Sequence, residues 1–312
     1  MQMKDAPEKT AESVGLPPAD RTALITGASS GIGLELAKLF ARDHFNLILV
    51  ARDRPRLKQL ADDLTHRYGI SAKVIEKDLS KPSAPKEIFE ELHRSALFID
   101  ILVNNAGIGV YGSFDENHLG EQLDSLQLNI MTLTSLTHLF LPEIKSRKGK
   151  ILNVASTAAF QPGPFMGCYF ASKAYVLFFS EAIANELKAS GVTVTALCPG
   201  PTQTNFQIRS GTQNIRESAI MMDAKTVAQI GYRGLMRGET VVVPGLMNKL
   251  LVFLVRFFPR DLVTRAARFF EERVPEKHSQ RSVVLTKKLN KKVKNRLLTT
   301  PVMTRLAPAS RL

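Results

Sequence analysis

The chain has 312 residues, enough for one large domain or two small ones, and its 44% hydrophobic and 23% charged content is that of a globular protein. It contains two cysteines, Cys168 and Cys198, which argues against a disulfide framework and predicts a reducing, cytoplasmic location. The net charge of +13 is concentrated at the end, because residues 275–312 hold ten Lys or Arg and a single Glu. No aromatic residue interrupts these basic residues, so we expect no nucleic-acid partner.

Four segments follow one another along the chain. Residues 1–20 lack the apolar core of a signal peptide and are expected to be a disordered leader. In residues 21–244 short apolar runs alternate with amphipathic stretches, which predicts a parallel sheet of about seven strands with helices on both faces. The expected strands are 23–26, 47–51, 72–76, 100–104, 150–155, 192–197 and 240–244. The expected helices are 34–43, 54–68, 84–95, 119–146, 170–190 and 224–237.

The last two segments lie beyond this alternating region. Residues 245–274 form an apolar helical extension that is too short to span a bilayer, and residues 275–312 form a basic, partly disordered tail. One interpretation is that the extension covers the substrate side of the fold or a subunit interface. The other is peripheral membrane contact through the extension and the tail. The sequence leaves both open.

A glycine-rich turn joins the first expected strand to the first helix. It reads TGASSGIG over residues 26–33, where glycines permit a tight turn and the helix N-terminus favours a bound phosphate. The second strand ends at Ala51, where NAD-binding proteins usually carry an acidic residue. The adjacent Arg52 is suited to a 2′-phosphate, so we expect NADP(H) as cofactor in preference to NAD(H).

Three further residues have the chemistry of an acid-base centre. Tyr169 and Lys173 are four residues apart, which places both on one face of a helix, and Ser156 ends the preceding strand. A nearby ammonium favours the phenolate, so we expect it to lower the pKa of Tyr169 from its ordinary value of about 10. A serine hydroxyl beside the tyrosine is placed to orient a substrate carbonyl.

Residues 21–244 resemble the short-chain dehydrogenase/reductase family. The resemblance rests on TGASSGIG (26–33), NNAG (104–107), Asn129, Ser156, YFASK (169–173) and Pro199-Gly200, all in the expected order. It implies a Rossmann-type doubly wound sheet and an enzyme that acts on CH-OH and C=O groups. It also implies a catalytic set of Asn129, Ser156, Tyr169 and Lys173. The cofactor-binding residues that it implies are Gly27, Ser29, Ser30, Gly31, Ile32, Gly33, Arg52, Asp78, Leu79, Asn105, Ala106, Gly107, Tyr169, Lys173, Pro199, Gly200 and Thr204.

The resemblance also assigns a role to each catalytic residue. Tyr169 would exchange the proton, Lys173 would hold the nicotinamide ribose, Ser156 would orient the carbonyl, and Asn129 would hold a water behind the lysine. Thr204 would meet the carboxamide, although Thr202 is an alternative two residues away. No metal site is expected, because the six histidines show no metal-ligand spacing.

The substrate is less sharply defined than the reaction. Residues 160–166 and a lid over 206–222 are largely apolar, which favours a hydrophobic ketone, a steroid-like carbonyl or a 3-oxoacyl thioester and hence a role in lipid metabolism. Two alternatives stay open: an NADP(H)-binding, membrane-associated scaffold with little turnover, and epimerase or dehydratase chemistry on the same fold. Members of this family often form homo-oligomers, which the C-terminal extension would either allow or block.

Overall fold

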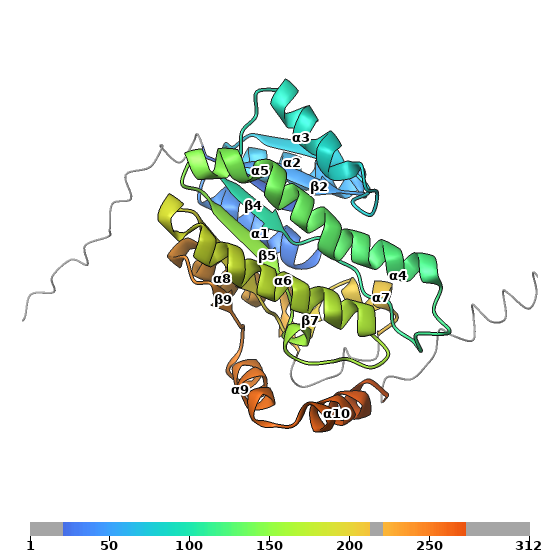
Figure 1. Cartoon of the computed structure of the whole chain (residues 1–312). Helices are drawn as coiled ribbons and strands as arrows, with labels where there is room; N and C mark the ends of the chain where they lie inside the picture. The colour runs from blue at the N-terminus through green and yellow to red at the C-terminus, as the bar shows by residue number, and fades with distance from the viewer. Residues whose placement is uncertain (1–20, 213–220, 273–312) are drawn as a thin grey trace, which may run out of the picture. The chain divides into compact units, whose positions relative to one another are not determined.

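A computed structural model describes residues 21–212 and 221–272 of the chain. Within these residues seven strands form one parallel sheet in the order β3-β2-β1-β4-β5-β6-β9, and helices cover both of its faces (Figure 1). The strands are β1 (Thr22–Thr26), β2 (Asn46–Ala51), β3 (Ala72–Glu76), β4 (Ile101–Asn104), β5 (Lys150–Val154), β6 (Thr193–Leu197) and β9 (Val241–Val242). The doubly wound fold and the strand positions predicted from the sequence are confirmed.

Local sequence signals account for the helix boundaries. Asp53 accepts a hydrogen bond from the backbone of Arg56 at the start of α2, and Gly69 ends that helix in the left-handed conformation. The helices are α1 (Gly31–Arg42), α2 (Arg54–Tyr68), α3 (Ala84–Arg94), α4 (Leu119–Leu126), α5 (Leu133–Ser146), α6 (Gly167–Glu186), α7 (Phe206–Ser210), α8 (Ala224–Arg237), α9 (Leu246–Leu254) and α10 (Arg260–Glu272). Four shorter turns of helix are η2 (Gln127–Thr132), η3 (Thr157–Phe160), η4 (Lys188–Ser190) and η6 (Val255–Phe257).

The core consists of two apolar layers on opposite faces of the sheet. Alternate residues of β1 enter different layers: Ala23 and Ile25 pack with α1, α2 and α8, whereas Leu24 packs with α3 and α5. This alternation follows from the two-residue period of a strand. Burial on both faces explains why these strands are almost continuously apolar.

The segment after β6 has more regular structure than the sequence indicated. Between Gly200 and about Met222 the sequence has no periodic pattern and predicts a long irregular loop that includes the lid, but β7 (Thr202–Gln203) pairs with β8 (Met222–Asp223), and α7 lies between them. Two-residue strands carry too little pattern to be recognised in a sequence. Part of the expected lid, including Arg216, lies outside the described residues, as do the expected leader and the basic tail.

The C-terminal extension forms α9, η6 and α10 and contacts the body of the fold. Asn248 of α9 lies against Gly200, where an added Cβ would be only 2.6 Å from the Asn248 Oδ1 atom. No helix in residues 21–212 or 221–272 combines the length and the apolar character needed to cross a membrane. The extension nevertheless exposes many large apolar side chains, including Leu246, Leu250, Phe253, Phe257 and Phe270.

Candidate active site

The catalytic candidates meet at the carboxyl edge of the sheet. Ser156 follows the end of β5 and caps η3, where its Oγ atom accepts a hydrogen bond from the Ala158 backbone at 3.1 Å. Tyr169 and Lys173 lie on the first turns of α6. The Tyr169 side chain is hydrogen-bonded to Ser156, so the strand end and the helix bring the two hydroxyl groups together.

Lys173 is buried in the floor of this site, with only 5% of its surface exposed. Its Nζ atom donates a hydrogen bond to the Val154 carbonyl oxygen at 2.8 Å and lies 5.7 Å from the centre of the Tyr169 ring. Burial disfavours the ammonium form and lowers the pKa of Lys173 to about 8, while Cys198 acts in the opposite direction. The lysine is therefore charged at neutral pH and titrates just above it.

The pKa of Tyr169 differs from the sequence prediction. Burial raises the pKa to about 12, the hydrogen bond from Ser156 lowers it, and Glu271 raises it further. The prediction that Lys173 lowers this pKa below 10 is wrong for this structure, because desolvation of the phenolate outweighs the hydrogen bond and the ammonium faces Val154. Tyr169 is thus a neutral phenol at neutral pH, which is the form that can donate a proton.

Asn129 lies in an interruption of the long helix predicted for residues 119–146. Residues 127–132 form a π-helical turn, a feature that often marks functional sites. The Asn129 side chain is 2% exposed; its Oδ1 accepts from the Ile108 backbone at 3.0 Å, and its Nδ2 donates to the Ile108 carbonyl at 2.8 Å. Nδ2 also donates to Ser172 on α6 at 3.0 Å, so Asn129 ties the chain after β4 to the catalytic helix.

The glycine-rich turn has the backbone that phosphate binding requires. Gly27 and Gly31 have φ angles of +67° and +58°, which residues with a Cβ rarely adopt. An added Cβ at Gly33 would lie 2.4 Å from the Asn105 Nδ2 atom, which itself donates to the Thr26 carbonyl at 2.8 Å. Asn105 therefore braces the turn from the end of β4. The first turn of α1 contains no acidic residue, so its N-terminal dipole is free to favour an anion.

Positive charge gathers beside this turn. Arg52 follows β2 and interacts electrostatically with Asp78 and with Arg209. The Arg209 guanidinium, from α7, donates to the Ser30 Oγ at 2.9 Å. Burial would raise the pKa of Asp78, but hydrogen bonds from Ser80 and the charge of Arg52 hold it below its usual value. The sequence predicts Arg209 as part of the lid, but its position over the turn depends on the fold of residues 200–212 and carries no local signal.

The residues after β6 close the other side of the turn. An added Cβ at Gly31 would lie 3.0 Å from the Thr204 methyl carbon, so Thr204 reaches the nucleotide turn. Thr202 is buried and donates to the Gly200 carbonyl at 2.9 Å. Of the two threonines left open by the sequence, Thr204 is the one beside the turn. Ser156 contacts the same segment, because its Oγ lies 3.4 Å from the Pro199 carbonyl oxygen.

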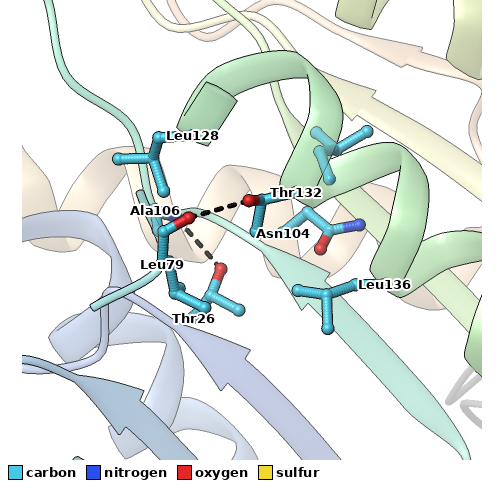
Figure 2. Close-up of a pocket in the computed structure, with 8 residues that line it drawn as sticks. Thr26, Leu79, Asn104, Ala106, Leu128, Thr132 and Leu136 are labelled. Atoms are coloured by element: carbon cyan, nitrogen blue, oxygen red, sulfur yellow. Dashed lines mark hydrogen bonds between the residues drawn. The ribbon is translucent and has the colours of Figure 1, made fainter. Parts of the chain in front are cut away.

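A small pocket lies behind the ends of β1 and β4 (Figure 2). It is lined by Thr26, Leu79, Asn104, Ala106, Leu128, Thr132, Leu133 and Leu136. Thr26 accepts from the Ala106 backbone at 3.0 Å, and Thr132 donates to the Leu79 carbonyl at 2.7 Å. Only Leu79 and Ala106 of the candidate site line this pocket, so it lies beside the predicted cofactor cleft and is separate from the catalytic group.

Gly109, Met166 and Phe206 form an apolar wall next to Tyr169. An added Cβ at Gly109 would meet Met166 at 2.8 Å, Phe206 at 3.0 Å and the Tyr169 ring at 3.4 Å. Met166 and Phe206 belong to the apolar segments 160–166 and 206–222 that the sequence predicts around the substrate, whereas no sequence pattern indicated Gly109. Among residues 21–212 and 221–272, no cluster of three or more His, Cys, Asp or Glu side chains has the geometry to hold a metal ion.

Known proteins resemble this chain over most of its length. A family model described as short chain dehydrogenase matches residues 21–214. The very-long-chain 3-oxoacyl-CoA reductase of Anas platyrhynchos is 35% identical over 184 residues, which are 57% of this chain and 58% of that protein. This chain therefore spans less than two thirds of the length of that relative. The 11-beta-hydroxysteroid dehydrogenase-like 4A of Arabidopsis thaliana is 32% identical over 252 residues, or 80% of this chain and 84% of that protein.

A solved structure gives a similar result. A short-chain dehydrogenase from Sphingobium yanoikuyae in complex with NADPH superimposes with a TM-score of 0.67 at 29% sequence identity. The superposition covers 92% of this chain and 98% of that one. It therefore includes part of the C-terminal extension as well as the region matched by the family model.

Proposed function

The chain belongs to the short-chain dehydrogenase family, and we propose that it is an NADP(H)-dependent oxidoreductase that acts on the carbonyl of a hydrophobic substrate. The observation that carries this proposal is the convergence of Ser156, Tyr169 and Lys173 at the carboxyl edge of the sheet. In open parallel sheets this edge is where ligands bind. The names of the relatives, a 3-oxoacyl-CoA reductase and a hydroxysteroid dehydrogenase-like protein, support a lipid-like substrate.

Each catalytic side chain has a distinct task in this proposal. The bound nicotinamide would supply or accept the hydride. Tyr169 donates a proton to the carbonyl oxygen during reduction, which suits the neutral phenol that burial maintains. Ser156 donates a hydrogen bond to the same oxygen and stabilises the negative charge that develops there. Lys173 holds the nicotinamide ribose and adds positive charge beneath the ring. Asn129, which joins Ile108 to the helix of Tyr169, holds a water behind the lysine.

The nucleotide turn fits the proposed cofactor. Gly27, Gly31 and Gly33 allow close approach of a pyrophosphate, and the unneutralised N-terminus of α1 favours its charge. In this proposal Arg52 and Ser30 bind the 2′-phosphate, and Asp78 and Leu79 flank the adenine. The remaining proposed contacts are those of Ser29, Ile32, Asn105, Ala106, Gly107, Pro199, Gly200 and Thr204. In Asn105 the side-chain amide already braces the turn, so its contribution is to shape the cleft.

Arg52→Ala is expected to raise KM for NADPH about tenfold or more, because a charged hydrogen bond to the phosphate is lost. KM for NADH should change by less than about threefold, since NADH has no 2′-phosphate. Initial-rate kinetics with both cofactors measures this. Arg54→Ala is the matched control, because the Arg54 side chain is exposed and lies 3.7 Å from Glu76. An equal loss with both cofactors would contradict the proposed role of Arg52.

The substrate class and the reaction can be tested together. Oxidation of NADPH is followed by its fluorescence with aliphatic ketones, steroid ketones and 3-oxoacyl thioesters. We expect turnover of at least one apolar class. Tight NADPH binding with no turnover of any class would favour the alternative of a nucleotide-binding scaffold. The complete catalytic set argues against that alternative, because Ser156 and Tyr169 are hydrogen-bonded to each other and Lys173 lies beneath the tyrosine ring.

We also propose that the extension, residues 245–274, contacts a membrane surface. Eleven of the 19 exposed large apolar side chains of the described residues lie between Leu246 and Phe270. Basic residues accompany them, including Lys249, Arg256 and Arg260, and the sequence of residues 275–312 is strongly basic. An apolar face with basic neighbours is typical of interfacial helices that bind anionic lipid. The domain boundaries at residues 20, 244 and 274, which the sequence predicts, are part of this proposal.

Replacing Phe253 and Phe257 by Ser in the full chain should lower partitioning onto anionic liposomes at least tenfold. Their side chains are 54% and 67% exposed, and burying each ring contributes about 1.5–3 kcal/mol. Flotation measures the bound fraction. Phe178→Ser is the control, because Phe178 on α6 is 67% exposed but lies outside the extension. Equal flotation of the wild type and the double variant would refute membrane contact through this face.

A further inference from the structure

The C-terminal helix α10 brings an acidic residue to the candidate active site. The Tyr111 hydroxyl, on the chain after β4, donates to the Glu271 backbone carbonyl at 2.9 Å. The Arg268 guanidinium lies 5.2 Å from the ring centre of Phe165, which precedes α6. Tyr111 and Tyr169 pack against the same small apolar cluster of Ala158, Met166 and Phe170. The last turn of α10 therefore lies beside the loops that border Tyr169.

One oxygen of the Glu271 carboxyl is buried and unpaired in the described part of the chain. Its Oε2 atom is buried and has no hydrogen-bond partner among residues 21–212 and 221–272. Burial raises the pKa of this carboxyl to about 7, and its charge in turn raises the pKa of Tyr169. An unpaired polar atom in an enclosed place costs free energy, and native proteins rarely keep one unless a ligand or water satisfies it. The contacts of Tyr111 and Arg268 place the last turn of α10 beside the loops that border Tyr169, and the effect of Glu271 on the pKa of Tyr169 agrees with that placement.

We propose that Glu271 is a substrate-binding residue that accepts a hydrogen bond from a hydroxyl group carried by the substrate in addition to its reacting carbonyl. This inference rests on the carbonyl-reducing function proposed above and narrows its substrate class to hydroxylated hydrophobic ketones. The apolar wall of Gly109, Met166 and Phe206 holds the carbon skeleton. Glu271 then supplies a polar contact that distinguishes one apolar ketone from another.

The charges around Glu271 favour a neutral donor. Tyr169 and Lys173 face the site from α6, Tyr111 faces it from the chain after β4, and Arg268 and Glu272 are on α10 itself, where they form an ion pair. A substrate ammonium near Tyr169 would meet the ammonium of Lys173, and a substrate carboxylate would be repelled by Glu271. A hydroxyl group meets neither penalty, and it satisfies the unpaired Oε2 atom.

The test compares straight-chain ketones that end in a hydroxyl with matched ketones in which a methyl group replaces it, at several chain lengths and with NADPH. Analogues ending in an amine or a carboxylate complete the panel. For the wild type we expect one chain length at which the hydroxy ketone has about tenfold higher kcat/KM than its methyl counterpart. In Glu271→Leu this ratio should fall to about one, because only the hydroxy ketone loses a hydrogen-bonding partner.

Two further variants separate recognition from a structural effect. Glu271→Gln keeps the size and an acceptor oxygen, so it should retain part of the preference. In the wild type the preference should strengthen as pH rises through about 7, because the carboxylate is the stronger acceptor, and this pH dependence should vanish in Glu271→Gln. Glu272→Gln, at the adjacent and exposed position, should leave the ratio unchanged.

The outcomes distinguish this inference from the proposed function. Turnover of plain ketones with no hydroxyl preference at any chain length overturns the role of Glu271 and leaves the reductase function in place. A preference for the amine or the carboxylate, or a ratio that is the same in Glu271→Leu as in the wild type, also overturns it. If the wild type reduces no ketone in this panel, this inference fails, whereas the reductase proposal fails only if steroid ketones and 3-oxoacyl thioesters are not reduced either.

Discussion

Replacing Tyr169 with Phe is expected to lower kcat for carbonyl reduction about a thousandfold, within the range that a lost general acid costs. The substitution removes one oxygen atom and keeps the ring, which packs against Phe170 and Phe206. The hydrogen bond between the phenol and Ser156 disappears, and a substrate carbonyl has lost its proton donor. Binding of NADPH should change by less than about threefold, because the nucleotide turn lies on β1 and α1.

The measurement combines steady-state turnover with fluorescence titration of NADPH. Tyr175→Phe is the matched control, since Tyr175 lies on the same helix and shares a hydrogen bond with Thr134 on the exposed side. That variant should keep full activity. If Tyr169→Phe retained more than about a tenth of wild-type kcat, another group would have to donate the proton. Loss of NADPH binding together with activity would instead indicate that the substitution disturbs the cleft.

Replacing Lys173 with Met should lower kcat/KM at least about a hundredfold, because the site loses its buried positive charge. Met has a similar length and apolar character, so the packing beneath Tyr169 is largely retained. The Val154 carbonyl loses its hydrogen bond from the ammonium, which costs about 1–3 kcal/mol of stability. A thermal melt checks that the variant is folded. Lys188→Met, at an exposed position just beyond α6, is the control and should behave as the wild type.

The pH profile tests the same lysine independently. The pKa of Lys173 is lowered to about 8, mainly by burial, so the ammonium is present below pH 8 and is lost as pH rises through it. The pKa of Tyr169 is about 12, so the tyrosine does not titrate in this range. Wild-type kcat/KM for reduction should therefore fall above about pH 8. The residual activity of Lys173→Met should show no such limb, and a limb that persisted would assign it to another group.

Much of the fold was readable because its signals are local. The apolar runs that became β1, β2 and β4 are nearly continuous, as burial on both faces requires, and the starts of α2 and α8 carry capping aspartates, Asp53 and Asp223. The π-helical turn at Asn129 was not readable in the same way. Its geometry depends on hydrogen bonds to Ile108 and to Ser172, residues that lie far from it in the sequence.

In the candidate site, too, some properties have local sequence signals and others depend on the fold. The residue types at the glycine turn and in YFASK indicated nucleotide binding and acid-base chemistry without any knowledge of the structure. The direction of the Tyr169 pKa shift could not be predicted from the sequence, because it is set by the balance between desolvation and one hydrogen bond. The location of Glu271 near the site could not be predicted either, since no pattern in residues 260–272 indicates that one acidic side chain of that helix lies towards the site.

The sequence by itself determined the family, the order of strands and helices, and the residues with the chemistry of carbonyl reduction. These properties depend on residue type and spacing over short stretches of chain. Only the tertiary structure decided which groups face one another: Lys173 against Val154, Arg209 over Ser30, and α10 beside Tyr169. Each of these contacts joins segments separated by many residues, and burial and charge at such contacts depend on the packed fold rather than on local pattern.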